Sequence, residues 1–396
     1  MNAAGGPEPV ATGLRAAPCA LLLALLLGLS SSSAHGHDAS AWGGLFRSRD
    51  HGATWFVASP GWFVGGAVAV AISPVDSDHL LLASESGLLR SRNGGRDWSL
   101  ENPSVFAGAV LAAAFDADGQ RALAATASRI VRTDGATPWR DTPAQGRAAP
   151  AHVIVRGAVP GRVYVAGPRG LSRSHDWGAS WERLADGLPD GGVTALAVSP
   201  RLPEVVYAVV GGQLWVKSEE ERWVRPASGI SGSQVDALSL DSREAMRIWA
   251  AGAGRVFRSD DRGTRWSPVG PPLPVPNTIV RGIAADGDSV ALTTDRGLYR
   301  TSDGGRRWTL LSDNLPAHLE AGPLVSDPFD PTTLYAGFSL KPYSELWRRT
   351  ADDDSALGRL SPASRAAGTA FLIILGLAAA AALGRLAYHY KTEHSR

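Results

Sequence analysis

The first side chains to weigh as acids or metal ligands are four aspartates, Asp50, Asp176, Asp261 and Asp303. Carboxylates act as general acids and bases, and groups of them bind metal ions. These four share one setting: each follows a serine or threonine by two residues and precedes a glycine by two. That spacing suits a turn, because hydroxyl and carboxylate side chains hydrogen-bond nearby backbone groups and glycine adopts a positive φ.

Each aspartate belongs to a repeat that ends in tryptophan. Five copies fit the pattern Ser/Thr-x-Asp/Asn-x-Gly-x-x-Trp, degraded copies lie at 133–139 and 218–223, and the tryptophans recur every 41 to 43 residues. The pattern resembles the Asp-box, or BNR, repeat, so we expect the tryptophan to pack beneath the turn and between neighbouring sheets. The five copies consist of Ser48, Asp50, Gly52, Trp55; Ser91, Asn93, Gly95, Trp98; Ser174, Asp176, Gly178, Trp181; Ser259, Asp261, Gly263, Trp266; and Thr301, Asp303, Gly305, Trp308.

Short apolar runs precede each box and predict the fold. Before the box at 218–223, for example, they are Val193–Val198, Val205–Val209 and Gln213–Val216, rich in β-branched residues and separated by glycine and proline. Three such strands plus one after the box, repeated about every 42 residues, make a propeller blade. We therefore predict an all-β fold: a propeller over residues 35–349 with four-stranded antiparallel blades.

The two ends of the repeat region predict how the ring closes. Residues 42–58 supply only a third and a fourth strand, six complete repeats follow, and residues 321–349 supply a first and a second strand. Completing one blade from both ends gives seven blades. The third strand is supplied twice, at 45–47 and 346–348, so eight blades remain the alternative.

Apolar segments flank the propeller. Residues 1–34 are predicted to be a signal peptide, with Arg15 before an uncharged run and small residues up to Ala34; an uncleaved anchor is the alternative. Residues 350–365 form a polar linker, 366–384 an uncharged stretch long enough to cross a bilayer as a helix, and 385–396 a basic tail. We expect a single-pass protein of the cell (inner) membrane, with its propeller on the periplasmic or exterior side.

Composition excludes several classes of function. The net charge of +1 gives no indication of nucleic-acid binding, and the single cysteine, Cys19, lies in the signal segment, so the propeller forms no disulfide of its own. No cofactor is predicted. Cleavage after Ala34 would expose His35 and His37 as a copper or nickel site, against the alternative of a solvated tail.

The turns between second and third strands carry the candidate binding residues. Five of seven hold a cation, and all seven should lie on the face opposite the boxes. Beside them, two loops are candidates for exposed apolar surface: 60–64, with Trp62 and Phe63, and 268–276. Exposed aromatics beside cations are typical of interface hot spots, so this face is predicted to dock a protein partner, against the alternative of a solvated surface. The five cations are Arg129, Arg169, Arg255, Arg296 and Lys341.

A second set of cations directly precedes the boxes. Its regularity suggests a structural role, in which each long stem covers the outer sheet while its charge stays in water. The set consists of Arg47, Arg90, Arg132, Arg173, Lys217, Arg258, Arg300 and Arg348.

Enzymatic activity finds little support in the sequence. Glycoside hydrolysis needs two placed carboxylates, and Glu85 and Glu345 are the only clear candidates in the predicted loops. Over about residues 42–349 the repeat pattern is most similar to the photosystem II stability and assembly factor family, non-enzymatic seven-bladed propellers with a basic patch; this chain differs by its own C-terminal membrane segment. We expect a non-catalytic scaffold or assembly factor for a membrane complex. The alternative is a carbohydrate-active propeller, sialidase- or glycosidase-like, and a lesser one a metal-handling accessory protein.

Overall fold

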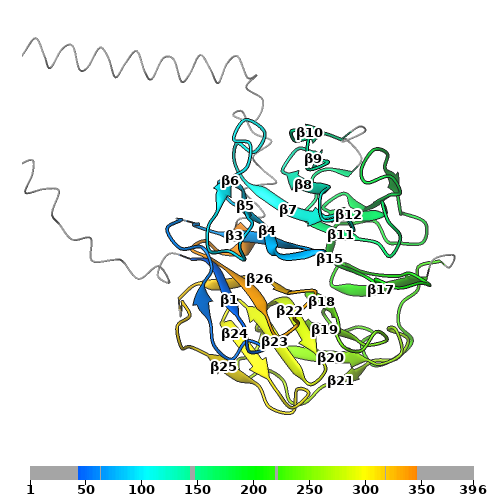
Figure 1. Ribbon diagram of the computed structural model, residues 1–396. Coiled ribbons are helices and arrows are strands. Elements are labelled where there is room, and N and C mark those ends of the chain that lie inside the picture. The colour runs from blue at the N-terminus through cyan, green and yellow to red at the C-terminus, as the bar shows by residue number, and fades with distance from the viewer. Residues whose placement is uncertain (1–42, 63, 143–147, 219–221, 317, 346–396) are drawn as a thin grey trace, which may run out of the picture.

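The computed structural model describes residues 43–345 except 63, 143–147, 219–221 and 317, and these residues form seven antiparallel sheets arranged in a ring. In Figure 1 the first strand of each sheet lies nearest the centre and the last lies at the rim. The fold is therefore an all-β, seven-bladed propeller, as the repeat predicts. We number the blades I to VII along the chain, beginning with the sheet of β3.

Each blade runs outward from its first strand. Blades I to III consist of β3 (Ala67–Ser73), β4 (Asp76–Ser84), β5 (Gly87–Ser91), β6 (Ser99–Leu100); β7 (Val110–Phe115), β8 (Ala122–Thr126), β9 (Ile130–Thr133), β10 (Arg140–Asp141); and β11 (Val153–Arg156), β12 (Val163–Gly167), β13 (Gly170–Ser174), β14 (Glu182–Arg183). Blades IV to VI consist of β15 (Val193–Val198), β16 (Val205–Val210), β17 (Gln213–Ser218); β18 (Ala237–Leu240), β19 (Ile248–Gly252), β20 (Arg255–Ser259), β21 (Ser267–Pro268); and β22 (Val280–Asp286), β23 (Ser289–Thr294), β24 (Gly297–Thr301), β25 (Thr309–Leu311).

Blade VII is assembled from both ends of the described chain, with strand order β2-β1-β27-β26. Its members are β26 (Glu320–Ser326), β27 (Leu334–Ser339), β1 (Gly44–Ser48) and β2 (Phe56–Val57). Phe46 pairs with Ala336 across the junction and packs edge-on against Phe338, with ring centroids 5.0 Å apart. The prediction of seven blades closed by strands from both ends is confirmed, and the eight-bladed alternative is wrong. A third strand from the C-terminal side is not formed at Glu345, which lies in a helical turn, and 346–348 lie outside the described residues.

Blade IV departs from the four-stranded pattern. Its sheet has three strands, and a single bridge between Val216 and Val224 stands where the other blades have a fourth strand. The preceding box is the degraded copy at 218–223, which lacks the glycine of the pattern. Loss of the turn residues thus accompanies loss of the outer strand.

The core is divided into seven apolar clusters, one at each junction between neighbouring blades. Trp181 of blade III, for instance, packs with Leu123 of blade II, and Trp55 of blade VII packs with Leu298 of blade VI. The repeat tryptophans are between 1% and 8% exposed. Each one therefore joins its own blade to the blade before it.

The five complete box turns share the hydrogen bond from the glycine N–H to the Ser/Thr hydroxyl, seen in the copy at 48–55. The tryptophan Nε1 donates to the glycine carbonyl in the copies of Trp55, Trp98 and Trp266, and has no partner among the described residues at Trp181 and Trp308. The Ser48 hydroxyl donates to Asp50 Oδ1 (2.7 Å) and accepts from the Gly52 N–H (2.8 Å), Gly52 has φ 81°, and Trp55 Nε1 donates to the Gly52 carbonyl (2.9 Å). Asp50 Oδ1 also accepts from the Thr54 N–H. The aspartate oxygens are thus used within the turn itself.

The predicted membrane segment at 366–384, the signal peptide at 1–34, the linker at 350–365 and the tail at 385–396 lie outside the described residues. Within residues 43–345, no helix is long and apolar enough to cross a bilayer. The membrane topology stays a prediction.

Replacing a repeat tryptophan should destabilise the ring. Trp181 is 8% exposed between blades II and III, so we expect Trp181→Ala to lower the free energy of unfolding by about 3–5 kcal/mol. Trp62 is 41% exposed, and Trp62→Ala is the matched control, with an expected loss below about 1 kcal/mol. Chemical denaturation of both variants measures the difference; equal losses would contradict the role assigned to the repeat.

Candidate functional site

The antiparallel order within each blade divides its turns between two faces of the ring. Turns between first and second strands and the box turns lie on one side, which we call the box face. Turns between second and third strands and the connections from one blade to the next lie on the other, which we call the far face. The predicted binding residues belong to the far face.

The five predicted cations lie on the far face, one each in blades II, III, V, VI and VII. Arg169, Arg255 and Arg296 are exposed, whereas Arg129 and Lys341 are partly buried. The structure distributes these cations around the face and does not gather them into one patch. Any partner that contacted all of them would have to cover most of the ring.

Carboxylates on the same face compensate three of the cations. Lys341 Nζ lies 2.5 Å from Glu85 Oε2, Arg129 Nη1 lies 3.4 Å from Asp141 Oδ1, and Arg296 Nε lies 3.5 Å from Asp295 Oδ2. Arg255, in contrast, has no ion pair within the part of the chain that the structure describes. The positive potential of the far face is therefore concentrated around fewer residues than the sequence predicts.

The connection from blade V to blade VI lies between two cationic turns. The Leu273 N–H donates to the Gly254 carbonyl (2.8 Å), and the Ile279 N–H donates to Asp295 Oδ1 (2.9 Å), so the loop is tied to the turns of Arg255 and Arg296. Between these ties Val275 and Ile279 are 36% and 44% exposed. Exposed apolar side chains are thus fixed next to two arginines, the composition of an interface hot spot.

A second apolar site lies where blade VII meets blade I. The Leu340 N–H donates to the Gly65 carbonyl (2.9 Å), which fixes the turn of Lys341 beside the loop of Trp62. Trp62 and Leu340 are each 41% exposed. Phe63, predicted to contribute to the same surface, lies outside the described residues. The structure thus places Trp62 near the Lys341 turn.

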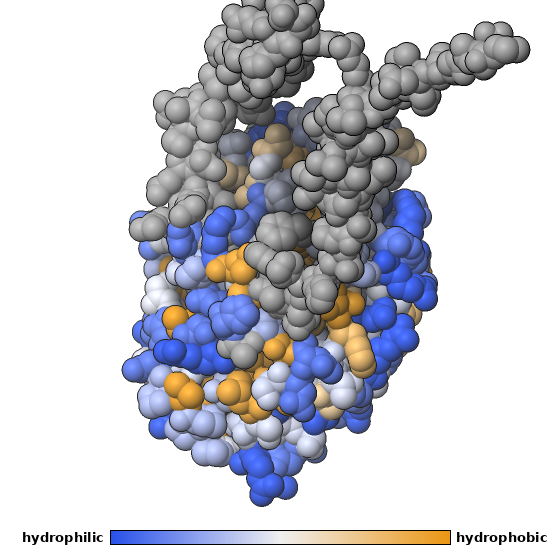
Figure 2. All heavy atoms as spheres, turned by 90° about the vertical axis from the view of Figure 1, so that its left-hand side faces the viewer, coloured by the Kyte–Doolittle hydropathy of each residue, from blue (hydrophilic) through white to orange (hydrophobic). Residues whose placement is uncertain are grey.

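Apolar side chains also occur along the rim. Figure 2 shows the side of the molecule that carries β1, β6 and β25, where apolar groups alternate with hydrophilic ones. On the outer strands, Phe56, Leu100 and Leu310 are between 43% and 63% exposed. Single exposed apolar residues are common on soluble proteins and do not by themselves indicate a binding site.

Two carboxylates on the far face, Glu85 and Glu320, are held by ion pairs. Glu85 is paired with Lys341, and Glu320 Oε2 lies 2.8 Å from Arg281 Nη2 while also accepting from the Tyr343 N–H (2.8 Å). The Arg281 guanidinium lies 5.4 Å from the centroid of the Tyr343 ring. Of the two acids the sequence proposed for glycoside hydrolysis, Glu85 is neutralised. Glu345 has a partner as well.

Tyr343, Arg281 and Glu320 were missed by sequence reasoning. Tyr343 is 2% exposed, and its hydroxyl donates to the Ala67 carbonyl of blade I (2.6 Å); burial raises the pKa of its phenol. One feature of the sequence could have indicated them: a charged residue in an otherwise apolar first strand. Arg281 is the second residue of β22, and Glu320 is the first residue of β26. First strands surround the centre of the ring, so a charge there needs a partner.

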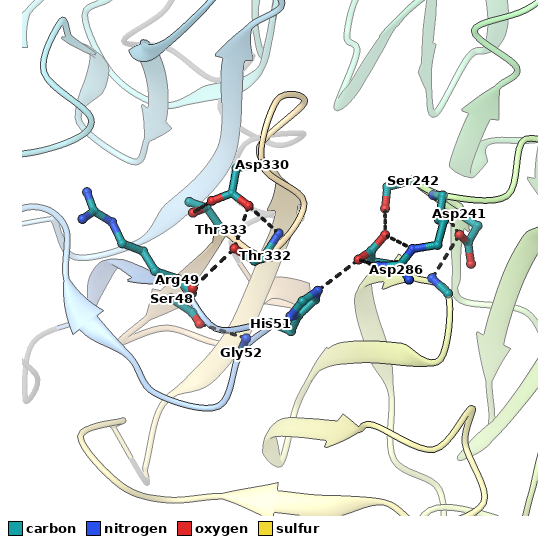
Figure 3. Close-up of polar contacts among 12 residues, drawn as sticks. Ser48, Arg49, His51, Gly52, Asp241, Ser242, Asp286, Asp330, Thr332 and Thr333 are labelled. Atoms are coloured by element: carbon teal, nitrogen blue, oxygen red, sulfur yellow. Dashed lines mark hydrogen bonds and ion pairs between the residues drawn. The ribbon is translucent and has the colours of Figure 1, made fainter.

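On the box face, buried carboxylates at the ends of first strands connect adjacent blades (Figure 3). Asp286 of blade VI accepts from Ser242 Oγ (2.8 Å) and Arg243 Nη2 (2.8 Å) of blade V, and its Oδ2 lies 3.0 Å from His51 Nε2 of blade VII. Asp241 of blade V accepts from the Gly287 N–H (3.1 Å) of blade VI. Three blades are joined through these two side chains.

Blade III has Gly157 at the position where blade II has Asp116 and blade V has Asp241. A Cβ at Gly157 would lie 2.7 Å from Glu204 Oε2, because Glu204 of blade IV extends into the space. Glu204 Oε1 lies 3.0 Å from Arg162 Nη1, and its carboxylate also accepts from the Tyr164 hydroxyl. The carboxylate is thus supplied from the next blade, and the link between blades is kept.

The box aspartates have the electrostatics of turn residues. Burial would raise the pKa of Asp261, but hydrogen bonds from Arg265 and Ser259 outweigh it and lower the pKa to about 2. A carboxyl that stays ionised in this way is a poor general acid at neutral pH. Among the described residues, no group of three or more His, Cys, Asp or Glu side chains could hold a metal ion; His35 and His37 lie outside them.

Seven antiparallel blades carrying Asp-box turns define the class: this chain is a seven-bladed Asp-box β-propeller. No family model matches the sequence. The fold matches YCF48 bound to a D1 peptide, with a TM-score of 0.54 and 18% identity, covering 70% of this chain and 93% of that one. It also matches YCF48 from Cyanidioschyzon merolae, with a TM-score of 0.53 and 15% identity, covering 70% of this chain and 96% of that one.

Xyloglucanases share the fold as well. The GH74 xyloglucanase from Xanthomonas campestris has a TM-score of 0.54 and 20% identity, covering 67% of this chain and 50% of that one. In sequence, a xyloglucanase from Hypocrea jecorina (strain QM6a) is 25% identical over 178 residues, which are 38% of this chain and 21% of that protein. The chain thus spans about a fifth of that relative's length. The resemblance to the assembly-factor propellers is borne out in fold, and xyloglucanases share it equally.

The carboxylate of Asp286 should contribute to stability in a pH-dependent way. Burial would raise its pKa, but hydrogen bonds from Arg243, Ser242 and His51 lower it below the usual 3.8. A carboxyl with a lowered pKa contributes stability above its unfolded pKa and loses that contribution as pH falls through the folded value. We therefore expect Asp286→Asn to cost about 1–3 kcal/mol at pH 7, with the difference from wild type shrinking below about pH 4.

Denaturation of Asp286→Asn across pH 3 to 8 measures this effect. Asp313 is exposed on the connection from blade VI to blade VII, so Asp313→Asn serves as the control. A difference from wild type that stays constant over the whole range would show that Asp286 contributes nothing through its charge.

Proposed function

We propose that this chain is a non-catalytic, membrane-anchored scaffold that assembles or stabilises a membrane protein complex by docking a partner on its far face. The anchor is the segment 366–384 predicted from the sequence, with the propeller on the periplasmic or exterior side. The fold match to YCF48 supports a protein partner, since that propeller is seen bound to a D1 peptide.

One observation carries the proposal: the loop that presents Val275 and Ile279 is tied to the turns of Arg255 and Arg296. A rigid loop loses little conformational freedom when it binds, so exposed apolar residues on it contribute efficiently to affinity. The uncompensated charge of Arg255 beside them favours an acidic partner segment with apolar side chains. Trp62 and Leu340, where blade VII meets blade I, form a second apolar site on the same face.

A triple charge reversal tests the docking face. We expect Arg169→Glu, Arg255→Glu and Arg296→Glu together to abolish recovery of the partner from detergent-solubilised membranes, because like charges would then oppose an acidic segment. These three side chains are exposed, so the variant should fold and sediment with membranes as wild type does. Affinity capture followed by mass spectrometry provides the measurement, and wild-type binding should weaken with added salt.

The control variant changes the net charge by the same amount, but on the box face. It carries Arg49→Glu, Arg92→Glu and Arg306→Glu, at three exposed positions within boxes. This variant should retain the partner. Full recovery by the far-face variant, or equal loss by both, would refute docking on the far face. A soluble wild-type chain would refute the anchor.

The second candidate is a carbohydrate-active propeller, which the similarity to xyloglucanases favours. Against it, Glu85 is paired with Lys341 and Glu320 with Arg281, so both carboxylates are engaged by cations of the chain itself and less available to a substrate. We expect the purified chain to release no reducing ends from xyloglucan. Release of reducing ends by the wild-type chain that is lost in Glu85→Gln or Glu320→Gln would establish a glycosidase instead. Glu101→Gln, in blade I, is the control and should not change the release.

A further inference from the structure

The cation that precedes each box is neutralised within several blades. In blade I Arg90 Nε lies 2.6 Å from Glu101 Oε1, in blade III Arg173 Nε lies 2.6 Å from Glu182 Oε1, and in blade V Arg258 Nε lies 3.2 Å from Asp260 Oδ2. Blade III shows the geometry most directly, because Arg173 and Glu182 are paired across adjacent strands. The Glu182 carboxylate also lies 3.0 Å from His175 Nε2.

Blade VI keeps this arginine and lacks the acid. Arg300 occupies the position of Arg173, and its cross-strand partner is Thr309 where blade III has Glu182. Arg300 Nε donates to the His51 carbonyl of blade VII (2.8 Å), and no carboxylate of the described chain lies within ion-pair distance of its guanidinium. The place of a carboxylate is therefore vacant beside an uncompensated arginine.

The structure has a groove of about 280 Å³ at this place, between blades VI and VII. In Figure 1 β24 and β25 lie beside β1 at this junction. The one acid in the lining, Asp303, is occupied by its own turn, since Oδ1 accepts from Thr301 Oγ1 (2.7 Å) and the Arg307 N–H (3.0 Å). The groove is lined by Ala53, Arg300, Thr301, Ser302, Asp303, Arg307, Thr309 and Leu311.

We propose that this groove binds a carboxylate, in the place that the Glu182 carboxylate takes in blade III. Arg300 would supply the charge-assisted hydrogen bonds from its Nη groups, because its Nε donates to the His51 carbonyl. The hydroxyl of Thr309 lies beside it, and Ser302 stands at the position of His175. Arg307 adds a second positive charge, which the charge of Asp303 in the same lining partly offsets. Ala53 and Leu311 offer an apolar wall for the carbon atoms next to the carboxylate. The site is separate from the far face and stands independently of the proposed function.

The carboxylate is that of an acidic peptide side chain, because Ala53 and Leu311 suit the methylene carbons of a glutamate better than the hydroxylated ring of a uronic acid. The full-length chain in detergent is titrated by calorimetry with tetraglutamate and, separately, with tetragalacturonate. We expect saturable one-to-one binding of tetraglutamate that weakens with added salt. Binding of tetragalacturonate alone, or of neither probe, overturns the proposal.

A carboxylate placed in the groove by mutation should block it. Thr309→Glu reproduces the pair seen in blade III, so we expect binding to weaken by about tenfold or more. Ser267→Glu is the matched control, since Ser267 stands opposite Arg258 in blade V, where Asp260 already pairs with the arginine. The control should bind as wild type does. Arg300→Gln should also lose binding, which keeps the proposal testable if Thr309→Glu fails to fold.

Undiminished binding in both Thr309→Glu and Arg300→Gln, or an equal loss in Ser267→Glu, would overturn the proposal. The far-face triple variant should still bind the probe, so failure of this site and failure of the docking face give different results.

Discussion

The packing of one tryptophan between two blades is the interaction on which the rest of this structure depends. A single four-stranded sheet has two apolar faces and cannot bury them alone. In every repeat, the box fixes the turn after the third strand and directs a tryptophan such as Trp55 or Trp181 into the cluster shared with the preceding blade. Because the contact is always with the previous blade, seven copies can close only as a ring, and both ends of the chain must meet in one sheet.

That dependence explains why so much of the fold could be predicted from the sequence. The box pattern sets the strand order, and an incomplete unit at each end requires closure between β1 and β27. The assignment of Arg169 and Arg255 to the far face followed from antiparallel strand order alone. Each of these inferences uses residues that are close in sequence or related by the repeat.

What could not be predicted are contacts set by the closed ring. Lys341 and Glu85 are 256 residues apart in sequence and lie side by side only because blades VII and I are adjacent. Glu204 replaces the carboxylate missing at Gly157 from the neighbouring blade, and no pattern within either repeat indicates it. Arg281 and Tyr343 meet in the same way. These pairs decide which charges on the far face are compensated, and sequence reasoning overestimated the basic ring for this reason.

The route of the chain through blade VII also has a mechanical consequence. Gly44 pairs with Phe338, so the first residue of β1 lies beside the last part of β27, at the same end of the two strands. Tension applied to the N-terminal end of β1 and the C-terminal end of β27 would therefore separate the two strands one hydrogen-bonded pair after another, starting at Gly44 and Phe338. It would not slide them past each other along their length. Tyr343 lies just beyond β27, buried and bonded to the Ala67 carbonyl in β3. A force applied to the C-terminal side would therefore act first on the contact of Tyr343 with blade I, and only afterwards on the pairing of β1 with β27.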